Sequence, residues 1–211
     1  MNRKGILVVV SGFSGAGKGT LMKRLLSKYD NYALSISMTT RAPRDKEADG
    51  REYFFVAKEE FEDKISKEGL IEYASYCGNY YGTPREYVEA QLECGKDVVL
   101  EIEIQGALQI KKKFPTALLL FVLPPTAEEL KKRLEGRGTE TAEVINSRLL
   151  RAREEADGIE NYDYIVVNDE LERCTQEMHS IIMAAHHTPD RNEEYIEKMR
   201  QELKVLLKGE K

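Results

Sequence analysis

The chain of 211 residues has no tryptophan, only three cysteines and no long hydrophobic run. Its longest apolar stretches, residues 6–10 and 117–123, fall far short of the ~20 residues that a membrane-spanning helix needs. The cysteines are scattered without a C-x-x-C pair, which favours a reduced, intracellular protein over a disulfide framework or a zinc site. Polar residues follow the first apolar stretch too soon for a secretory signal peptide. We therefore expect a cytoplasmic protein with no membrane partner.

A strong excess of either charge is also lacking. The 37 acidic and 32 basic residues give a net charge of −5. A slightly acidic chain is poorly suited to non-specific binding of the nucleic-acid backbone, so no nucleic-acid partner is expected. Hydrophobic residues make up 41% of the chain, which is enough to form a core and excludes wholesale disorder.

Strands and helices are expected to alternate along the chain. Residues 6–10 form a continuous apolar run rich in valine, which is typical of a strand buried on both faces of a parallel sheet. The expected strands are 6–10, 33–37, 53–56, 70–76, 97–104, 117–123 and 164–167. The expected helices are 20–29, 58–67, 84–95, 126–134, one ending near 157, one ending near 187 and an amphipathic helix beyond 190. This alternation predicts a doubly wound α/β fold.

A glycine-rich turn follows the first strand. Residues 12–18, GFSGAGK, match the pattern G-x-x-x-x-G-K between a buried strand and a helix. Glycines let successive backbone N–H groups surround a phosphate, and the following helix adds the positive end of its dipole. Lys18 brings a full charge to the β- and γ-phosphates. The turn therefore predicts a site for a nucleoside triphosphate.

Basic and aromatic residues suited to a second phosphorylated substrate follow. Arg41 and Arg44 lie three residues apart in a polar loop, and Tyr53 comes shortly after. Two guanidinium groups converging on one site suit a phosphate dianion. Without Tyr53 and Tyr81, the two arginines are also compatible with a basic surface loop.

Acidic and hydroxyl side chains then occur in or beside expected strands. Glu72 places a carboxylate in an apolar strand, and the block 78–83, GNYYGT, adds tyrosine and threonine hydroxyls. Glu101 and Glu103 are two residues apart in the expected strand 97–104, so they are expected on one face. Acids at the end of such a strand should point into the cleft at the carboxyl edge of the sheet.

From these blocks the chain resembles the guanylate kinase family over residues 4 to about 187. The matching blocks are 12–20, 39–44, Gly50 with 53–55, 78–82, 103–106, 136–140 and 167–169. The resemblance implies a P-loop kinase three-layer fold with a parallel sheet core, a small mixed β-rich GMP-binding lobe and a helical lid. It implies transfer of the ATP γ-phosphoryl group to GMP or dGMP, giving ADP and GDP, in purine metabolism and GMP recycling.

The resemblance also implies individual roles. The implied ATP-binding residues are Gly12, Phe13, Ser14, Gly15, Ala16, Gly17, Lys18, Gly19, Thr20, Arg133, Arg137 and Asn168. The implied GMP-binding residues are Ser37, Arg41, Arg44, Tyr53, Glu72, Tyr81, Thr83, Glu101 and Glu103. The implied catalytic residues are Lys18, Arg41, Arg137 and Arg148. Mg²⁺ is expected to bind with ATP, largely through phosphates and water, and no site held by protein side chains alone is expected.

The guanine base supports the role of Glu72 on physical grounds. Guanine presents N1–H and its N2 amine on one edge, and one carboxylate can accept hydrogen bonds from both. Adenine has an acceptor at N1 and no 2-amine. A site built around that donor pair can reject an analogue lacking it by roughly 10⁴-fold.

The resemblance divides the chain into a guanylate kinase domain, 1–188, and a C-terminal helical extension, 189–211. The domain's expected parts are a core (1–36, 85–125 and 157–188), a GMP-binding lobe (37–84) and a lid (126–156). Apolar residues at helical spacing in the extension either pack on the protein's own body or form a surface for a partner or a second copy. A monomer and a homodimer both remain compatible with the sequence.

Other interpretations stay open at this point. The arginines of the expected lid are also typical of a solvated helix with salt bridges to its own glutamates. The domain is also compatible with a non-catalytic guanylate-kinase-like module that binds phosphopeptides. Such modules typically lose parts of the phosphate loop or lid arginines, whereas Lys18, Arg137 and Arg148 are all present here. A P-loop kinase for another small phosphate acceptor is disfavoured by Glu72 and Tyr81.

Overall fold

A computed structural model describes residues 4–45, 47–76, 78–136 and 141–208. The strands are β1 (Leu7–Gly12), β2 (Tyr32–Leu34), β3 (Met38–Thr39), β4 (Phe54–Phe55), β5 (Leu70–Tyr76), β6 (Asn79–Pro84), β7 (Asp97–Glu101), β8 (Leu118–Leu123) and β9 (Tyr164–Val167). The helices are α1 (Lys18–Lys28), α2 (Lys58–Ser66), α3 (Arg85–Glu93), α4 (Ile104–Lys113), α5 (Ala127–Glu135), α6 (Ala142–Ala156), α7 (Leu171–Ala185) and α8 (Glu193–Lys208), with short 3₁₀ turns at Ile159–Asn161 and Pro189–Arg191.

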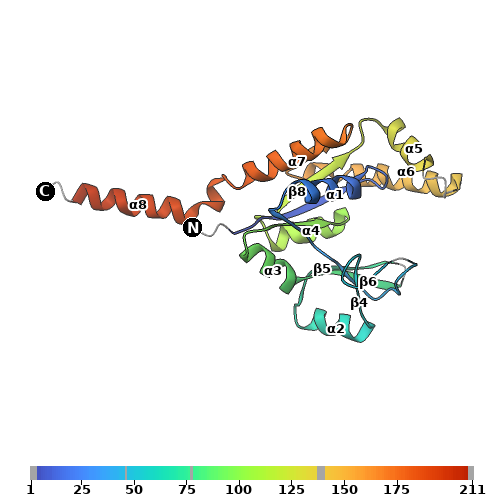
Figure 1. Cartoon of the computed structure of the whole chain (residues 1–211), viewed down its shortest axis with the longest axis horizontal. Helices are drawn as coiled ribbons and strands as arrows, with labels where there is room; N and C mark the ends of the chain where they lie inside the picture. The colour runs from blue at the N-terminus through green and yellow to red at the C-terminus, as the bar shows by residue number, and fades with distance from the viewer. Residues whose placement is uncertain (1–3, 46, 77, 137–140, 209–211) are drawn as a thin grey trace.

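The main sheet is parallel, with strand order β2-β7-β1-β8-β9. Successive side chains of a strand point to opposite faces, so both faces of the central β1 are buried by apolar residues. Val8 and Val10 pack in one cluster with residues of α1 and α7. Leu7 and Val9 pack in another with residues of α3 and α4. The sheet therefore lies between two helical layers (Figure 1), as the predicted three-layer α/β fold requires.

A second, smaller sheet has the order β4-β3-β6-β5. It is mixed, because β3 and β4 run parallel while β6 runs antiparallel to both β3 and β5. Helix α2 covers it through Phe61, which is fully buried with Met38 and Leu70. Figure 1 shows this lobe beside the main sheet, below α3 and α4.

Helices α5 and α6 lie at one end of the molecule and α8 extends from the other (Figure 1). The buried residues Ile145 and Ala152 join α6 to the main core.

On α8 the apolar stripe is exposed: Tyr195 is 55% accessible, Leu203 51% and Leu206 69%. The interpretation that this stripe packs on the protein's own body is therefore wrong for these residues. Within the described residues, no helix combines the length and the apolar composition that a membrane span requires.

Two expected strands differ from the observed elements. The stretch 33–37 contributes only to β2, and β3 follows in the other sheet. The expected strand 97–104 is too long, because β7 ends at Glu101 and α4 begins at Ile104. The last sheet bond runs from the amide of Ile102 to the carbonyl of Val10, after which Ser11 caps the carbonyl of Ile102. Glu103 is thus the residue before a helix, and its expected place on a strand face with Glu101 is wrong.

Candidate functional site

The glycine-rich turn connects β1 to α1 at the carboxyl edge of the main sheet. Gly15 and Gly17 have φ values of +93° and +90°, which L side chains rarely adopt. A Cβ on Gly17 would also lie 2.4 Å from Nδ2 of Asn168. The ring of Phe13 packs edge-on against Phe121, with centroids 5.3 Å apart, and fixes the start of the turn in the core. The loop's shape therefore requires glycine at these two positions.

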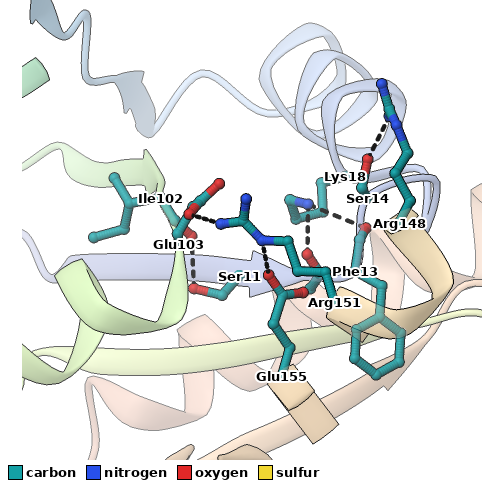
Figure 2. A network of polar contacts seen from close by, with 10 residues as sticks. Ser11, Phe13, Ser14, Lys18, Ile102, Glu103, Arg148, Arg151 and Glu155 are labelled. Carbon is teal, nitrogen blue, oxygen red and sulfur yellow. Dashed lines mark hydrogen bonds and ion pairs between the residues drawn. The ribbon is translucent and has the colours of Figure 1, made fainter. Parts of the chain in front are cut away.

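Lys18 is held at the first turn of α1. Its Nζ donates to the carbonyl of Gly12 at 2.7 Å and to that of Phe13 at 3.3 Å (Figure 2). A cavity of about 370 Å³ opens beside it, lined by Ser14, Gly15, Gly17, Lys18, Gly19, Thr20, Lys23 and Glu101. The structure thus groups much of the predicted ATP site with Glu101, one of the predicted GMP-site residues. Sequence reasoning misses Lys23, whose signal is its position one helical turn after Gly19.

Asn168 and Arg133 both hydrogen-bond to the backbone of the glycine-rich turn. The buried amide of Asn168 donates to the carbonyl of Ala16 at 2.8 Å. Arg133 donates to the backbone carbonyls of Asn168 (2.9 Å) and Ala16 (3.3 Å), while Glu129 on its own helix pairs with its Nε at 2.8 Å. These contacts join α5 and the segment after β9 to the phosphate-binding turn.

Two arginines of α6 reach toward the same region. Arg148 donates to the hydroxyl of Ser14 at 2.7 Å, and Arg151 pairs with both Glu103 and Glu155 (Figure 2). The alternative that these arginines pair only within their own helix is wrong, because Arg148 and Arg151 both contact other elements. Arg137 lies outside the described residues, so its predicted roles stay predictions.

The arginine loop lies on the smaller sheet. Arg41 forms a salt bridge with Glu47 at 3.0 Å, and its guanidinium lies 5.4 Å from the centroid of the Tyr53 ring. Tyr53 in turn meets Tyr81 edge-on, with centroids 6.0 Å apart. The hydrogen bond from Arg41 lowers the pKa of Glu47, so this pair is ionised at neutral pH. Three predicted GMP-site residues are thus brought together.

Glu47 also orders the backbone of this loop. Its carboxylate accepts a 2.8 Å hydrogen bond from the amide of Arg44. The Arg44 side chain has no ion pair among the residues that the structure describes, although its amide is fixed. Sequence reasoning misses Glu47, because the polar segment 41–51 contains several acids at comparable spacing. Ser37 is fixed through its backbone, whose carbonyl accepts from the amide of Phe54 at 2.9 Å.

Glu72 is a buried carboxylic acid on β5. Its side chain is 6% exposed and accepts a 2.7 Å hydrogen bond from the fully buried hydroxyl of Thr83. Burial raises the pKa of Glu72, because desolvation penalises the charged form. A Cβ on Gly106 would lie 3.3 Å from the second oxygen of Glu72, so the first turn of α4 closes one side of this acid. The predicted pair Glu72 and Thr83 therefore forms one buried unit.

The comparisons with known proteins agree with this geometry. The family model described as guanylate kinase matches residues 4–185. The chain belongs to the guanylate kinase family. A guanylate kinase of Bacillus anthracis is 49% identical over 203 residues, covering 96% of this chain and 99% of the relative. One from Lactococcus lactis subsp. lactis is 48% identical over 205 residues, covering 97% and 100%.

A solved guanylate kinase structure supports the same family and fold. The crystal structure of guanylate kinase from Anaplasma phagocytophilum superposes with a TM-score of 0.72 at 32% identity, covering 90% of each chain. The predicted guanylate kinase family and P-loop kinase fold are therefore confirmed.

The donor set beside the phosphate loop fits Mg²⁺ brought in by a nucleotide. Among the described residues, no group of three or more His, Cys, Asp or Glu side chains is placed to hold a metal ion. The Thr20 hydroxyl and the Glu101 carboxylate line the same cavity as Lys18. Oxygen ligands from one or two side chains, together with phosphates and water, are what Mg²⁺ takes in nucleotide sites.

Proposed function

We propose that this chain transfers the γ-phosphoryl group of ATP to GMP or dGMP, giving ADP and GDP. The observation that carries the proposal is the buried pair Glu72–Thr83 in a chain that also has the phosphate-binding turn with Lys18. The two are linked by a short stretch of chain, because Glu101 lines the phosphate-loop cavity and Gly106 backs Glu72. A base seated at Glu72 would therefore lie close to the triphosphate.

Glu72 is the proposed selector of guanine. Thr83 occupies one of its oxygens, which orients the carboxylate and leaves acceptor positions for N1–H and N2 of the base. Adenine would set its N1 lone pair against this acid and leave buried groups unpaired. Glu103 is proposed to contact the base from the start of α4.

The phosphate of GMP is proposed to lie against Arg41, Arg44, Tyr53 and Tyr81, with Ser37 beside them. Arg41 already rests on the ring of Tyr53, and Glu47 holds its guanidinium by an ion pair. This packing supports pre-positioning, because a group held before the substrate arrives loses less side-chain freedom on binding.

Phosphoryl transfer is proposed to proceed by positioning and charge neutralisation, without a covalent enzyme intermediate. Backbone amides of residues 12–20 and Lys18 would hold the β- and γ-phosphates, and Arg148 would neutralise the transferring group. Arginine at this position is worth roughly 10³–10⁵ in rate in phosphoryl-transfer enzymes. Arg137 is proposed to act with Arg148, while Arg133 and Asn168 border the adenine side.

The proposed division into a core, a GMP-binding lobe (37–84) and a lid (126–156) fits this chemistry. Closure of a lid would exclude water, which otherwise competes with GMP for the phosphoryl group. Mg²⁺ bound with ATP would supply neutralisation of phosphate charge, and Thr20 and Glu101, which line the cavity beside Lys18, would hold it or its water.

The proposed location is the cytoplasm, supported by the free thiols of Cys94 and Cys174. Assembly as a monomer or a homodimer stays an open proposal. The exposed stripe on α8 supports the homodimer, since it offers apolar surface that a second copy would cover.

A coupled assay tests the proposal directly. Purified protein with Mg²⁺ and ATP is offered GMP, dGMP, AMP and UMP in turn, and formation of ADP and of each diphosphate is followed. GMP should exceed AMP in kcat/KM by about 10⁴-fold, since a buried hydrogen-bonding site discriminates on that scale. Absence of GDP, or equal rates with GMP and AMP, would contradict the proposal.

A further inference from the structure

Helix α6 presents two arginines, three residues apart, to two different parts of the site. Arg148 donates to Ser14 in the phosphate-binding turn at 2.7 Å. Arg151 pairs with Glu103 at the start of α4, and its Nε also pairs with Glu155 at 3.0 Å. Figure 2 shows Arg151 reaching between the two carboxylates while Arg148 points to the loop. Residues three apart share one face of a helix, so one helical face contacts both regions.

Glu103 stands on a fixed part of the chain. The carbonyl of its neighbour Ile102 accepts a 2.7 Å hydrogen bond from Ser11, the last residue before the glycine-rich turn. Gly106, in the first turn of α4, lies against Glu72. In the chain, Glu103 therefore lies between Ile102, which is hydrogen-bonded to β1, and Gly106, which contacts Glu72.

The Arg151–Glu103 pair contributes little to the stability of the fold. The two side chains are 43% and 69% exposed, and exposed ion pairs are weak because water screens them. Ile145 and Ala152 already anchor α6 through buried apolar contacts. The pair is instead a contact from the arginine-bearing face of α6 to the start of α4, beside the site.

We propose that Arg151 is a positioning residue, which couples occupation of the GMP site to placement of Arg148 by pairing with Glu103. The inference rests on the proposed function. A carboxylate has two oxygens and about four acceptor positions, so Glu103 can accept from a base N–H and from Arg151 together. Glu155 holds the other edge of the same guanidinium. A guanine base that holds the Glu103 side chain in place would, through Arg151, also hold α6 in place. Because such coupling is reciprocal, holding α6 in place would strengthen the binding of GMP.

The test compares Arg151→Ala with Arg153→Ala. Arg153 is exposed on the same helix and has no ion pair among the residues that the structure describes, so its replacement removes the same charge without the contact. We expect Arg151→Ala to lower kcat/KM for GMP about 10-fold, within the usual range of coupling between sites. Binding of a non-hydrolysable ATP analogue without GMP should change less than about twofold, and Arg153→Ala should match the wild type. Arg151→Lys should recover only part of the loss, since lysine cannot bridge two carboxylates with a planar fork.

A double-mutant cycle identifies the partner through which Arg151 acts. In a Glu103→Ala background, Arg151→Ala should cause less than about a twofold further loss, because the contact is already removed. An equal loss in both backgrounds, or equal behaviour of Arg151→Ala and Arg153→Ala, would overturn the inference while leaving the proposed function intact. Failure of the wild type itself to phosphorylate GMP would instead overturn the proposed function.

Discussion

The hydroxyl of Thr83 donates a 2.7 Å hydrogen bond to Glu72, and both side chains are buried. Desolvation raises the pKa of Glu72 above its ordinary value of 4.5, and the Thr83 bond opposes that rise only in part. The proposed guanine contact needs the ionised acid, because a protonated carboxyl loses acceptor capacity toward N1–H and N2. Proton binding and base binding therefore compete at this residue.

The affinity for GMP should fall as pH is lowered through the raised pKa of Glu72. The pH dependence of folding stability should have the opposite sign, because a carboxyl with a raised folded-state pKa favours the folded state at low pH and loses that contribution as pH rises. Titration calorimetry with GMP across this range measures the effect. Glu72→Gln is the control, since its remaining pH dependence reports the phosphate of GMP. If GMP affinity depended on pH in the same way in the wild type and in Glu72→Gln, Glu72 would not contact the base.

Lys18→Ala should lower turnover by at least about 10²-fold, the scale of losing one preorganised electrostatic contact. Its ammonium group is hydrogen-bonded to the carbonyls of Gly12 and Phe13 in the glycine-rich turn and does not pack in the core. The fold should therefore be unaffected. Steady-state kinetics give the loss, and circular dichroism verifies the fold. Near-normal turnover by a folded variant would contradict the proposed role.

Asn168→Ala should weaken ATP binding more than GMP binding. Removing the amide leaves the carbonyl of Ala16 with only the longer 3.3 Å bond from Arg133 among the described contacts, and the loss of a hydrogen bond costs about 0.5–1.5 kcal/mol. The loop should loosen, which raises KM for ATP several-fold. Asn161→Ala is the matched control, because Asn161 is exposed and, within the described part of the chain, its side chain bonds only to the nearby carbonyl of Gly158. Equal kinetics for the two variants would show that Asn168 does not support the loop.

Leu203→Ala on α8 should change the free energy of unfolding by less than about 0.5 kcal/mol, as is usual for exposed positions. Leu134→Ala, at a fully buried position, should cost about 2–5 kcal/mol. Urea unfolding of dilute protein measures both values. A large cost at Leu203 that grows with protein concentration would indicate that a second copy covers the stripe.

Local patterns account for what could be predicted. The phosphate loop is specified within a few residues by glycine spacing and by the buried strand before it, and β9 begins and ends at the expected residues, Tyr164 and Val167. Glu72 is recognisable as a carboxylate in an apolar strand. These features depend on neighbours in sequence, so the sequence contains enough information to identify them.

Tertiary contacts account for what could not be predicted. The alternation V-V-L-E-I-E-I continues past the end of β7, and only the pairing of Ile102 with Val10 and Ser11 determines where the sheet stops. The contact between Arg151 and Glu103 joins residues 48 apart in the chain. No periodicity specifies such a partner, because Arg151 also has Glu155 at helical spacing.

Helix α8 leaves the body at the end opposite α5 and α6 (Figure 1). A fluorescent label or an affinity handle joined at its far end would be remote from α5 and α6, the helices of the proposed lid, and from the proposed nucleotide sites. Immobilising the enzyme through the end of α8 should therefore preserve its turnover, whereas immobilising it through α6 should lower the turnover.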